Sequence, residues 1–131
     1  RIDGLTTIDD TKKYELLTRL DSAPKHKKIC HGDLNPLNII ISEKDNKAYV
    51  IDWNHATQGN ASADVARTYL WLCIYHKDIA EKYIDLFCEK SNTDKTYVQR
   101  WLPVVAAARL TKNIAEEKEL LSKWIDVVEY E

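Results

Sequence analysis

The apolar and polar positions divide the chain into a leading helix, a short β region and a helical remainder. Between Asp9 and Asp21, residues Tyr14, Leu17 and Leu20 recur at helical spacing. The proline at position 24 disfavours helical backbone in the residue before it. We therefore predict a first helix over 9–21, followed by a basic, loop-like segment.

Two β-branched runs follow this helix and predict a hairpin. Residues 38–42 read NIIIS, residues 48–52 read AYVID, and the polar turn EKDNK joins them. Antiparallel pairing places the start of one strand beside the end of the next. We therefore expect Asn38 and Asp52 to be neighbours in space.

The next segment predicts a buried helix over about 63–76, with Ser62 as its N-cap. Residues 69–75 read YLWLCIY and are apolar on every side. A helix of this kind is typical of the centre of a domain. We expect this segment and the four tryptophans to belong to the core.

Three further helices are predicted beyond this one. One begins near Asp78, one near Thr93 or Thr96, and the last runs over about 115–130. We expect their inward-facing residues to be Ile79, Tyr83, Leu86, Phe87, Val98, Trp101, Leu102, Val105, Leu120, Leu121, Trp124, Ile125 and Val128.

The composition fits a single domain spanning residues 1–131. A hydrophobic fraction of 44% and a charged fraction of 31% are typical of a soluble globular protein and exclude a disordered or membrane one. The expected divisions are a leading helix and linker (1–28), a segment of polar motifs (29–66) and a helical subdomain (67–131). The predicted fold class is mainly α with a small β-hairpin.

The net charge and the cysteines bear on the binding partners and the cellular compartment of the protein. A net charge of −2 gives no reason to expect a nucleic-acid or acidic-membrane partner. The three cysteines, Cys30, Cys73 and Cys88, are widely spaced, which favours free thiols in a reducing, cytoplasmic compartment. The chain has no methionine and begins at Arg1, so we expect it to be a piece of a longer protein.

Candidate chemistry lies around the predicted hairpin. Asp33 stands on a loop before it, while Asn38 and Asp52 meet at its open end. Oxygen ligands of this kind suit Mg²⁺, which proteins usually hold with one or two carboxylates and substrate phosphates. A further carboxylate beside the metal can accept a proton from a hydroxyl. These residues are therefore suited to phosphoryl transfer.

Two motifs resemble a known family. HGDLNPLN at 31–38 resembles the catalytic loop of the aminoglycoside phosphotransferase and choline kinase group, and IDWNHATQGNASADVA at 51–66 resembles its second motif. The resemblance is good over 29–72. It implies a protein-kinase-like fold of which this chain is the C-terminal lobe only, with the N-lobe absent. It also implies transfer of the γ-phosphoryl group of ATP, with Mg²⁺, to a hydroxyl of an aminoglycoside-, choline- or sugar-like molecule.

The resemblance assigns roles by position. Asp33 would be the catalytic base or would orient the substrate hydroxyl. Asn38 and Asp52 would bind Mg²⁺. Asp64 would support the loop by accepting hydrogen bonds from its backbone, and His31 would orient the loop without transferring protons.

The resemblance also assigns Ile40 and Ile51 to the floor beneath the adenine. Gly32 stands where protein kinases carry an arginine that reads a phosphorylated loop, which favours a small-molecule substrate. The sequence contains no Gly-rich loop and no strand lysine. We therefore expect the chain alone to bind ATP weakly without measurable turnover. We also expect a homodimer through the exposed surface that would meet the N-lobe.

Several alternatives stay open. The same carboxylates fit a Mg²⁺-dependent phosphohydrolase, and the chain also fits a non-catalytic interaction module derived from a kinase. Asp33 fits a turn-forming residue before Pro36, and Asp64 fits a favourable carboxylate in the first turn of a helix. The acidic residues at 116, 117 and 119 favour a solvated helix face over a site for a cationic substrate.

Overall fold

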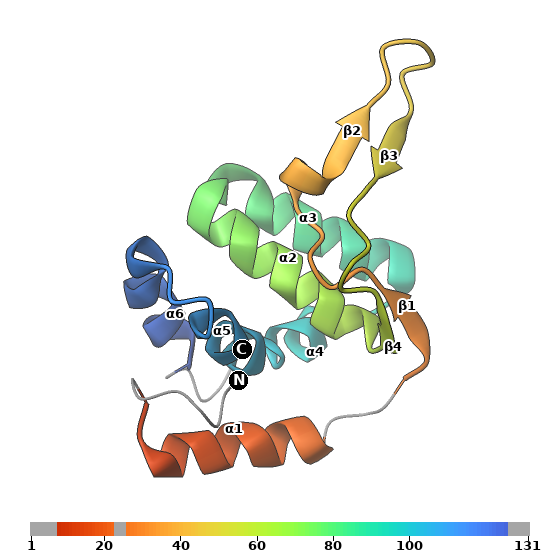
Figure 1. Cartoon of the computed structure of the whole chain (residues 1–131). Helices are drawn as coiled ribbons and strands as arrows, with labels where there is room; N and C mark the ends of the chain where they lie inside the picture. Colours follow the sequence, from red (N-terminus) through yellow and green to blue (C-terminus); the bar gives the residue numbers. More distant parts are fainter. Residues whose placement is uncertain (1–7, 23–25, 126–131) are drawn as a thin grey trace.

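The computed structural model describes residues 8–22 and 26–125 (Figure 1). This part of the chain is mainly helical with two small antiparallel sheets. The predicted mainly-α class with a hairpin is therefore confirmed, and the second sheet is an addition to it. No helix of the described residues has the length and apolar character needed to cross a membrane.

Among the described residues, the four short strands all lie between the first two α-helices, and the rest of the chain is helical. The helices are α1 (Asp10–Ser22), α2 (Ala61–Tyr75), α3 (Lys77–Ser91), α4 (Lys95–Gln99), α5 (Leu102–Leu110) and α6 (Lys118–Ile125), with 3-10 turns η2 (Pro36–Asn38) and η3 (Ala115–Glu117). The strands are β1 (Lys28–Cys30), β2 (Ile39–Ile41), β3 (Ala48–Val50) and β4 (Thr57–Gly59).

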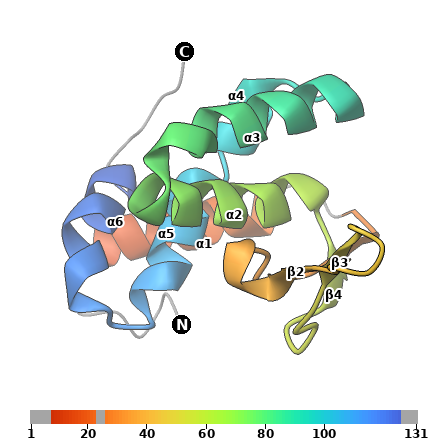
Figure 2. The ribbon, with the colours of Figure 1, turned by 90° about the horizontal axis from the view of Figure 1, so that it is seen from above.

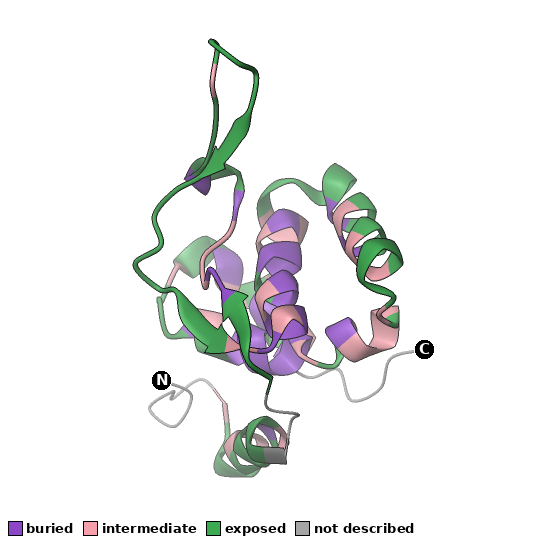
Figure 3. Ribbon diagram, turned by 90° about the vertical axis from the view of Figure 1, so that its right-hand side faces the viewer, coloured by how far each residue is buried: buried purple, intermediate pink, exposed green. Residues whose placement is uncertain are grey.

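Helix α2 is the centre of the fold. It packs against α3, α4 and α5 (Figure 2), and burial is concentrated along it (Figure 3). Leu70 and Leu72 within the YLWLCIY segment are buried, which confirms the expected central helix. The cap is Asn60 instead of the predicted Ser62, because the Asn60 side chain accepts a hydrogen bond from the Ser62 backbone N–H at 2.9 Å.

The predicted hairpin is present as β2 and β3, which pair antiparallel with Ile40 opposite Tyr49. It extends away from the helical body in Figure 1, and all residues of both strands are exposed. The second sheet pairs β1 with β4 and brings Cys30 opposite Thr57. This sheet has no signal in the sequence, because the β4 sequence TQG has no apolar alternation.

The predicted stripe on α3 is partly wrong. Ala80 and Ile84 are the buried residues of this helix, whereas Ile79 is 41% and Leu86 is 51% exposed. The buried pair lies at i, i+4 spacing on the face toward α2, where the small Ala80 permits close approach. The exposed pair lines an apolar groove of about 340 Å³ that also includes Ile39.

The last predicted helix begins later than expected. Residues 115–117 form the 3-10 turn η3, and α6 continues from it with Leu121 and Ile125 buried. Residues 126–131 lie outside the described residues, and the predicted inward position of Val128 lies there too.

Candidate active site

The loop that follows β1 is attached to one face of α2. Both carboxylate oxygens of Asp64 accept hydrogen bonds from this loop, from the backbone N–H of His31 at 2.9 Å and of Gly32 at 2.8 Å. One helical turn later, the Thr68 hydroxyl donates to the backbone oxygen of Leu34 at 2.6 Å. The resemblance implies this arrangement for Asp64. The loop position is therefore set by a helix of the core.

Gly32 occupies a backbone position that other residues adopt poorly. Its φ is +90°, and a Cβ added there would lie 2.6 Å from the backbone oxygen of His55. No real Cβ contact is so short, and the obstructing atom is backbone. The tight passage of the loop past residue 55 therefore requires a glycine.

His31 connects the loop to the end of the hairpin. Its Nδ1 accepts a hydrogen bond from the Asp33 backbone N–H at 3.1 Å, so the ring proton is on Nε2, which donates to the backbone oxygen of Ile51 at 2.8 Å. The ring is 3% exposed and lies 4.7 Å from the Trp53 ring. Both nitrogens are occupied by the protein, an arrangement that suits positioning of the loop.

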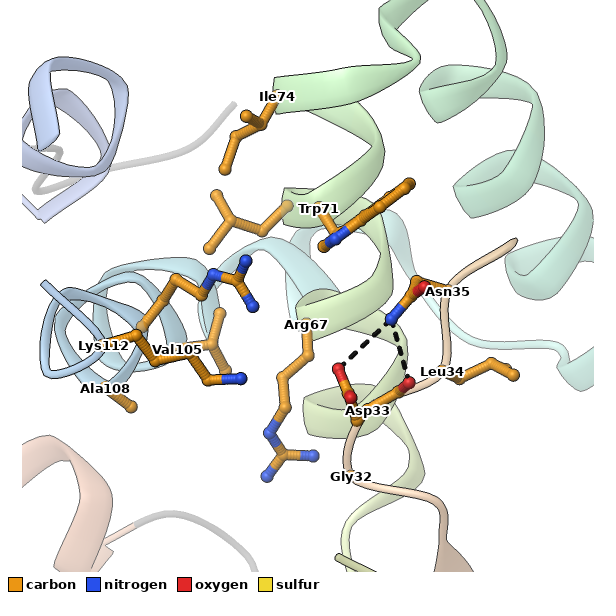
Figure 4. Close-up of a pocket in the computed structure, with 12 residues that line it drawn as sticks. Gly32, Asp33, Leu34, Asn35, Arg67, Trp71, Ile74, Val105, Ala108 and Lys112 are labelled. Atoms are coloured by element: carbon orange, nitrogen blue, oxygen red, sulfur yellow. Dashed lines mark hydrogen bonds between the residues drawn. The ribbon is translucent and has the colours of Figure 1, made fainter. Parts of the chain in front are cut away.

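The structure brings the side chains of Asp33 and Asn38 together. Asn38 Nδ2 donates to the backbone oxygen of Asp33 at 2.8 Å and lies 3.4 Å from its carboxylate Oδ2. Asn35, which the sequence analysis missed, donates to carboxylate Oδ1 at 3.2 Å and also caps η2. Both asparagines are buried. Two amides therefore fix the orientation of the half-buried Asp33 carboxylate. Figure 4 shows the contact made by Asn35.

Asp52 is joined to this cluster through the backbone. The Ile51 backbone N–H donates to the Asn38 backbone oxygen at 2.9 Å, and Asp52 follows with a left-handed φ of 59°. Its exposed carboxylate makes no hydrogen bond or ion pair with the described residues. The meeting of this carboxylate with the Asn38 amide at one ion stays a prediction.

The donor set fits Mg²⁺. Within residues 8–22 and 26–125, no group of three or more His, Cys, Asp or Glu side chains could hold a metal ion. Mg²⁺ needs no such group, because water and substrate phosphates complete its shell. Asn38 directs its amide nitrogen to Asp33, which leaves its Oδ1 as the acceptor end. Asp52 supplies an uncommitted carboxylate.

The two residues assigned to the adenine floor lie on the hairpin side. Ile40 is 51% and Ile51 is 39% exposed. Ile40 stands in β2 opposite Tyr49, and Ile51 follows directly after β3. The structure thus leaves both side chains open to contact, and their role toward a nucleotide stays a prediction.

A cavity of about 180 Å³ opens beside Asp33, between the loop, α2 and α5 (Figure 4). Trp71 lines it and packs against the hydrophobic core, as do Trp101 and Trp124. Trp53 is 49% exposed and lies outside this core, so the expectation that all four tryptophans are core residues is wrong for Trp53. Three cationic side chains also line it, and the sequence analysis missed them: Arg67, Arg109 and Lys112. The position of Arg67, three residues after Asp64 on α2, was a usable signal.

One wall of the cavity rests on a buried ion pair. Arg109 binds Glu117 through two parallel contacts, Nε–Oε1 at 2.7 Å and Nη2–Oε2 at 2.9 Å, and the Tyr75 hydroxyl donates to the same carboxylate. Glu117 is fully buried, so its predicted place on a solvated face is wrong. The hydrogen bond from Arg109 is the main reason that the pKa of Glu117 is lowered.

The sequence model of the phosphotransferase enzyme family matches residues 8–109, more than half of the chain. The chain therefore belongs to the phosphotransferase enzyme family. This membership confirms the resemblance to the aminoglycoside phosphotransferase and choline kinase group, and it defines a kinase-type enzyme in general terms. No curated protein and no solved structure matches the chain.

Proposed function

We propose that this chain is the C-terminal lobe of a kinase-like phosphotransferase that transfers the γ-phosphoryl group of ATP to a hydroxyl of a small molecule. The observation that carries the proposal is the position of Asp33. Its carboxylate is fixed by two buried amides at the edge of a cavity, on a loop that α2 braces. The family match over residues 8–109 supports the same chemistry.

In the proposed reaction, Asp33 receives the proton of the acceptor hydroxyl as the oxygen attacks. A bond forms between this oxygen and the γ-phosphorus. The bond from the γ-phosphorus to its bridging oxygen breaks, and the electron pair leaves on ADP. Catalysis of this kind depends mainly on positioning and charge neutralisation. Asn35 and Asn38 contribute positioning, because they hold the carboxylate in one orientation.

The hairpin side would hold the nucleotide. Asp52 and the Oδ1 of Asn38 would hold Mg²⁺, which when bound neutralises phosphate charge. Ile40 and Ile51 offer exposed apolar surface for the adenine. The proposal also accounts for an open hairpin, because a ligand would cover residues that the chain itself leaves exposed.

The test is Mg²⁺-dependent ATP binding by the 131-residue chain, measured by isothermal titration calorimetry. We expect modest affinity that Asp52→Asn weakens by about tenfold or more, since one metal carboxylate is lost, equivalent to at least ~1.4 kcal/mol. Asp33→Asn should leave binding nearly unchanged, because this residue acts on the acceptor.

The matched control is Asp10→Asn, an exposed aspartate on α1 that lies apart from the hairpin (Figure 1). Equal ATP binding by Asp52→Asn and Asp10→Asn would contradict the proposed metal role. ATP binding that is independent of Mg²⁺ would contradict it as well.

A further inference from the structure

The cavity beside Asp33 contains more hydrogen-bond donors than the chain itself uses. Arg67 commits Nη1 to Asp64 at 3.1 Å, and Arg109 commits Nε and Nη2 to Glu117. Nε and Nη2 of Arg67 and Nη1 of Arg109 make no hydrogen bond with the described residues. Lys112 forms no ion pair with them either. Its charge adds to the effect of Arg109 in lowering the pKa of Glu117.

The carboxylates around the cavity are already committed. Asp33 is the acidic residue among the lining residues, and it is the group proposed to meet the reacting hydroxyl. Asp64 and Glu117 are not among the lining residues, and each is paired with one arginine. A cationic acceptor would therefore find no separate counter-ion here. An anionic group would find Lys112 and the remaining guanidinium donors.

The placement of these groups fits one small molecule that spans the cavity. In Figure 4, Asp33 lies on the loop side, Lys112 lies on the α5 side, and Arg67 extends between them from α2. Asp33 is also close enough to Arg109 to contribute to its raised pKa, after the larger effect of the Glu117 hydrogen bond. The volume of about 180 Å³ is below the ~300 Å³ at which drug-sized ligand pockets begin.

We infer that the acceptor is a small molecule carrying both a hydroxyl and an anionic group, a carboxylate or a phosphate, with the anion on Lys112, Arg67 and Arg109 and the hydroxyl at Asp33. This inference rests on the proposed function for the identity of the ligand as an acceptor. It departs from the aminoglycoside-like and choline-like acceptors that the family resemblance suggests.

The experiment measures binding of four probes to the 131-residue chain by calorimetry at low ionic strength without nucleotide. D-Glycerate and glycerol 3-phosphate carry a hydroxyl and an anion, glycerol is neutral, and choline is cationic. We expect both anions to bind at least about tenfold more tightly than glycerol and choline, since each anion gains charge-assisted hydrogen bonds that the neutral and cationic probes lack. The anion that binds more tightly shows whether the cavity prefers a carboxylate or a phosphate.

Variants locate the site. Lys112→Gln should weaken binding of the better anion about tenfold, and Lys112→Glu should abolish it. Lys44→Gln, at the exposed tip of the hairpin, is the matched control and should change nothing. Equal binding of choline, no binding of any probe, or unchanged binding by Lys112→Gln would overturn the inference.

The proposed phosphotransferase function and the proposed anionic acceptor are tested by independent experiments. Asp52→Asn tests the nucleotide side and does not touch the cavity, whereas the probe series needs neither ATP nor Mg²⁺. A chain that prefers the anionic probes but shows no Mg²⁺-dependent ATP binding would retain the anion specificity of the cavity and lose the proposed function.

Discussion

The loop that carries Asp33 and the hairpin that leads to Asp52 are built in different ways. The loop is held by side chains of α2, and both of the asparagines that orient Asp33 are buried. The hairpin consists of two strands of three residues each, exposed along their whole length. The side of the site proposed to bind the acceptor is thus braced by a core helix, while the side proposed to bind the nucleotide is held by backbone pairing between two exposed strands.

The largest effect on stability is expected when the ion pair between Arg109 and Glu117 is removed. Glu117→Ala leaves the Arg109 guanidinium, whose side chain is 19% exposed, without its partner. We expect a loss of about 3–5 kcal/mol in the free energy of unfolding, the usual result when one member of a buried pair is removed. Urea denaturation measures it, with the exposed Glu119→Ala on α6 as the control.

The same pair predicts a pH dependence. The pKa of Glu117 is lowered in the folded state by the hydrogen bond from Arg109, so its contribution is fully present above the unfolded value of about 4.3. It is lost as the pH falls through the lowered folded value. Urea midpoints of the wild type should therefore fall in that acidic window. If Glu117→Ala lowers the free energy of unfolding no more than Glu119→Ala does, the ion pair does not support this wall of the cavity.

A smaller effect is expected from the residue that braces the loop. Asp64→Ala leaves two loop N–H groups without their acceptor, and we expect a loss of about 2–4 kcal/mol in stability. Asp78→Ala is the matched control, because Asp78 is also an acidic residue in the first turn of a helix, α3. It should cost only ~0.3–1 kcal/mol. If urea denaturation shows equal losses in the free energy of unfolding for Asp64→Ala and Asp78→Ala, Asp64 acts only as a favourable charge at the helix N-terminus and does not brace the loop.

The smallest effect on stability is expected on the hairpin. Ile40→Lys changes an exposed side chain and should alter the free energy of unfolding by no more than ~0.5 kcal/mol. Ile84→Ala in the core should cost about 2–5 kcal/mol and serves as the contrast.

The same Ile40→Lys variant tests the homodimer expected from the sequence. Ile40, Tyr49 and Ile51 leave apolar surface open, and such surface favours association. Sedimentation velocity should therefore show self-association of the wild type that Ile40→Lys reduces. A wild type that sediments as a monomer at every concentration would contradict the dimer.

The features that were predicted correctly are each encoded by a pattern within one short stretch of the sequence. The hairpin follows from β-branched runs around a polar turn, and α2 from an apolar segment too hydrophobic for a surface. The Asp33 loop was recognisable from its motif. Its contact with Asn38 spans only five residues, so it depends on a short stretch of chain.

The features that were missed depend on contacts between distant segments. Glu117 lies in an acidic run that is typical of a solvated face, but in the structure it is buried and bound by the distant Tyr75 and the nearer Arg109. The cavity wall at Lys112 depends on how α5 packs against α2, which periodicity cannot fix. The β1–β4 sheet joins segments that have no shared pattern.

That sheet has a consequence for how the chain can vary. Because Cys30 pairs with Thr57, residues 31–56 begin and end at the same point: the first of them are held against α2, and the hairpin of β2 and β3 extends outward. The polar turn at 43–47 is the far end of this excursion. Lengthening a flexible connection is inexpensive, about 0.6 kcal/mol for each doubling. Insertions at this turn can therefore lengthen the β2–β3 hairpin and change which groups its tip can contact. The β1–β4 sheet, which holds the two ends of the segment together, keeps its geometry.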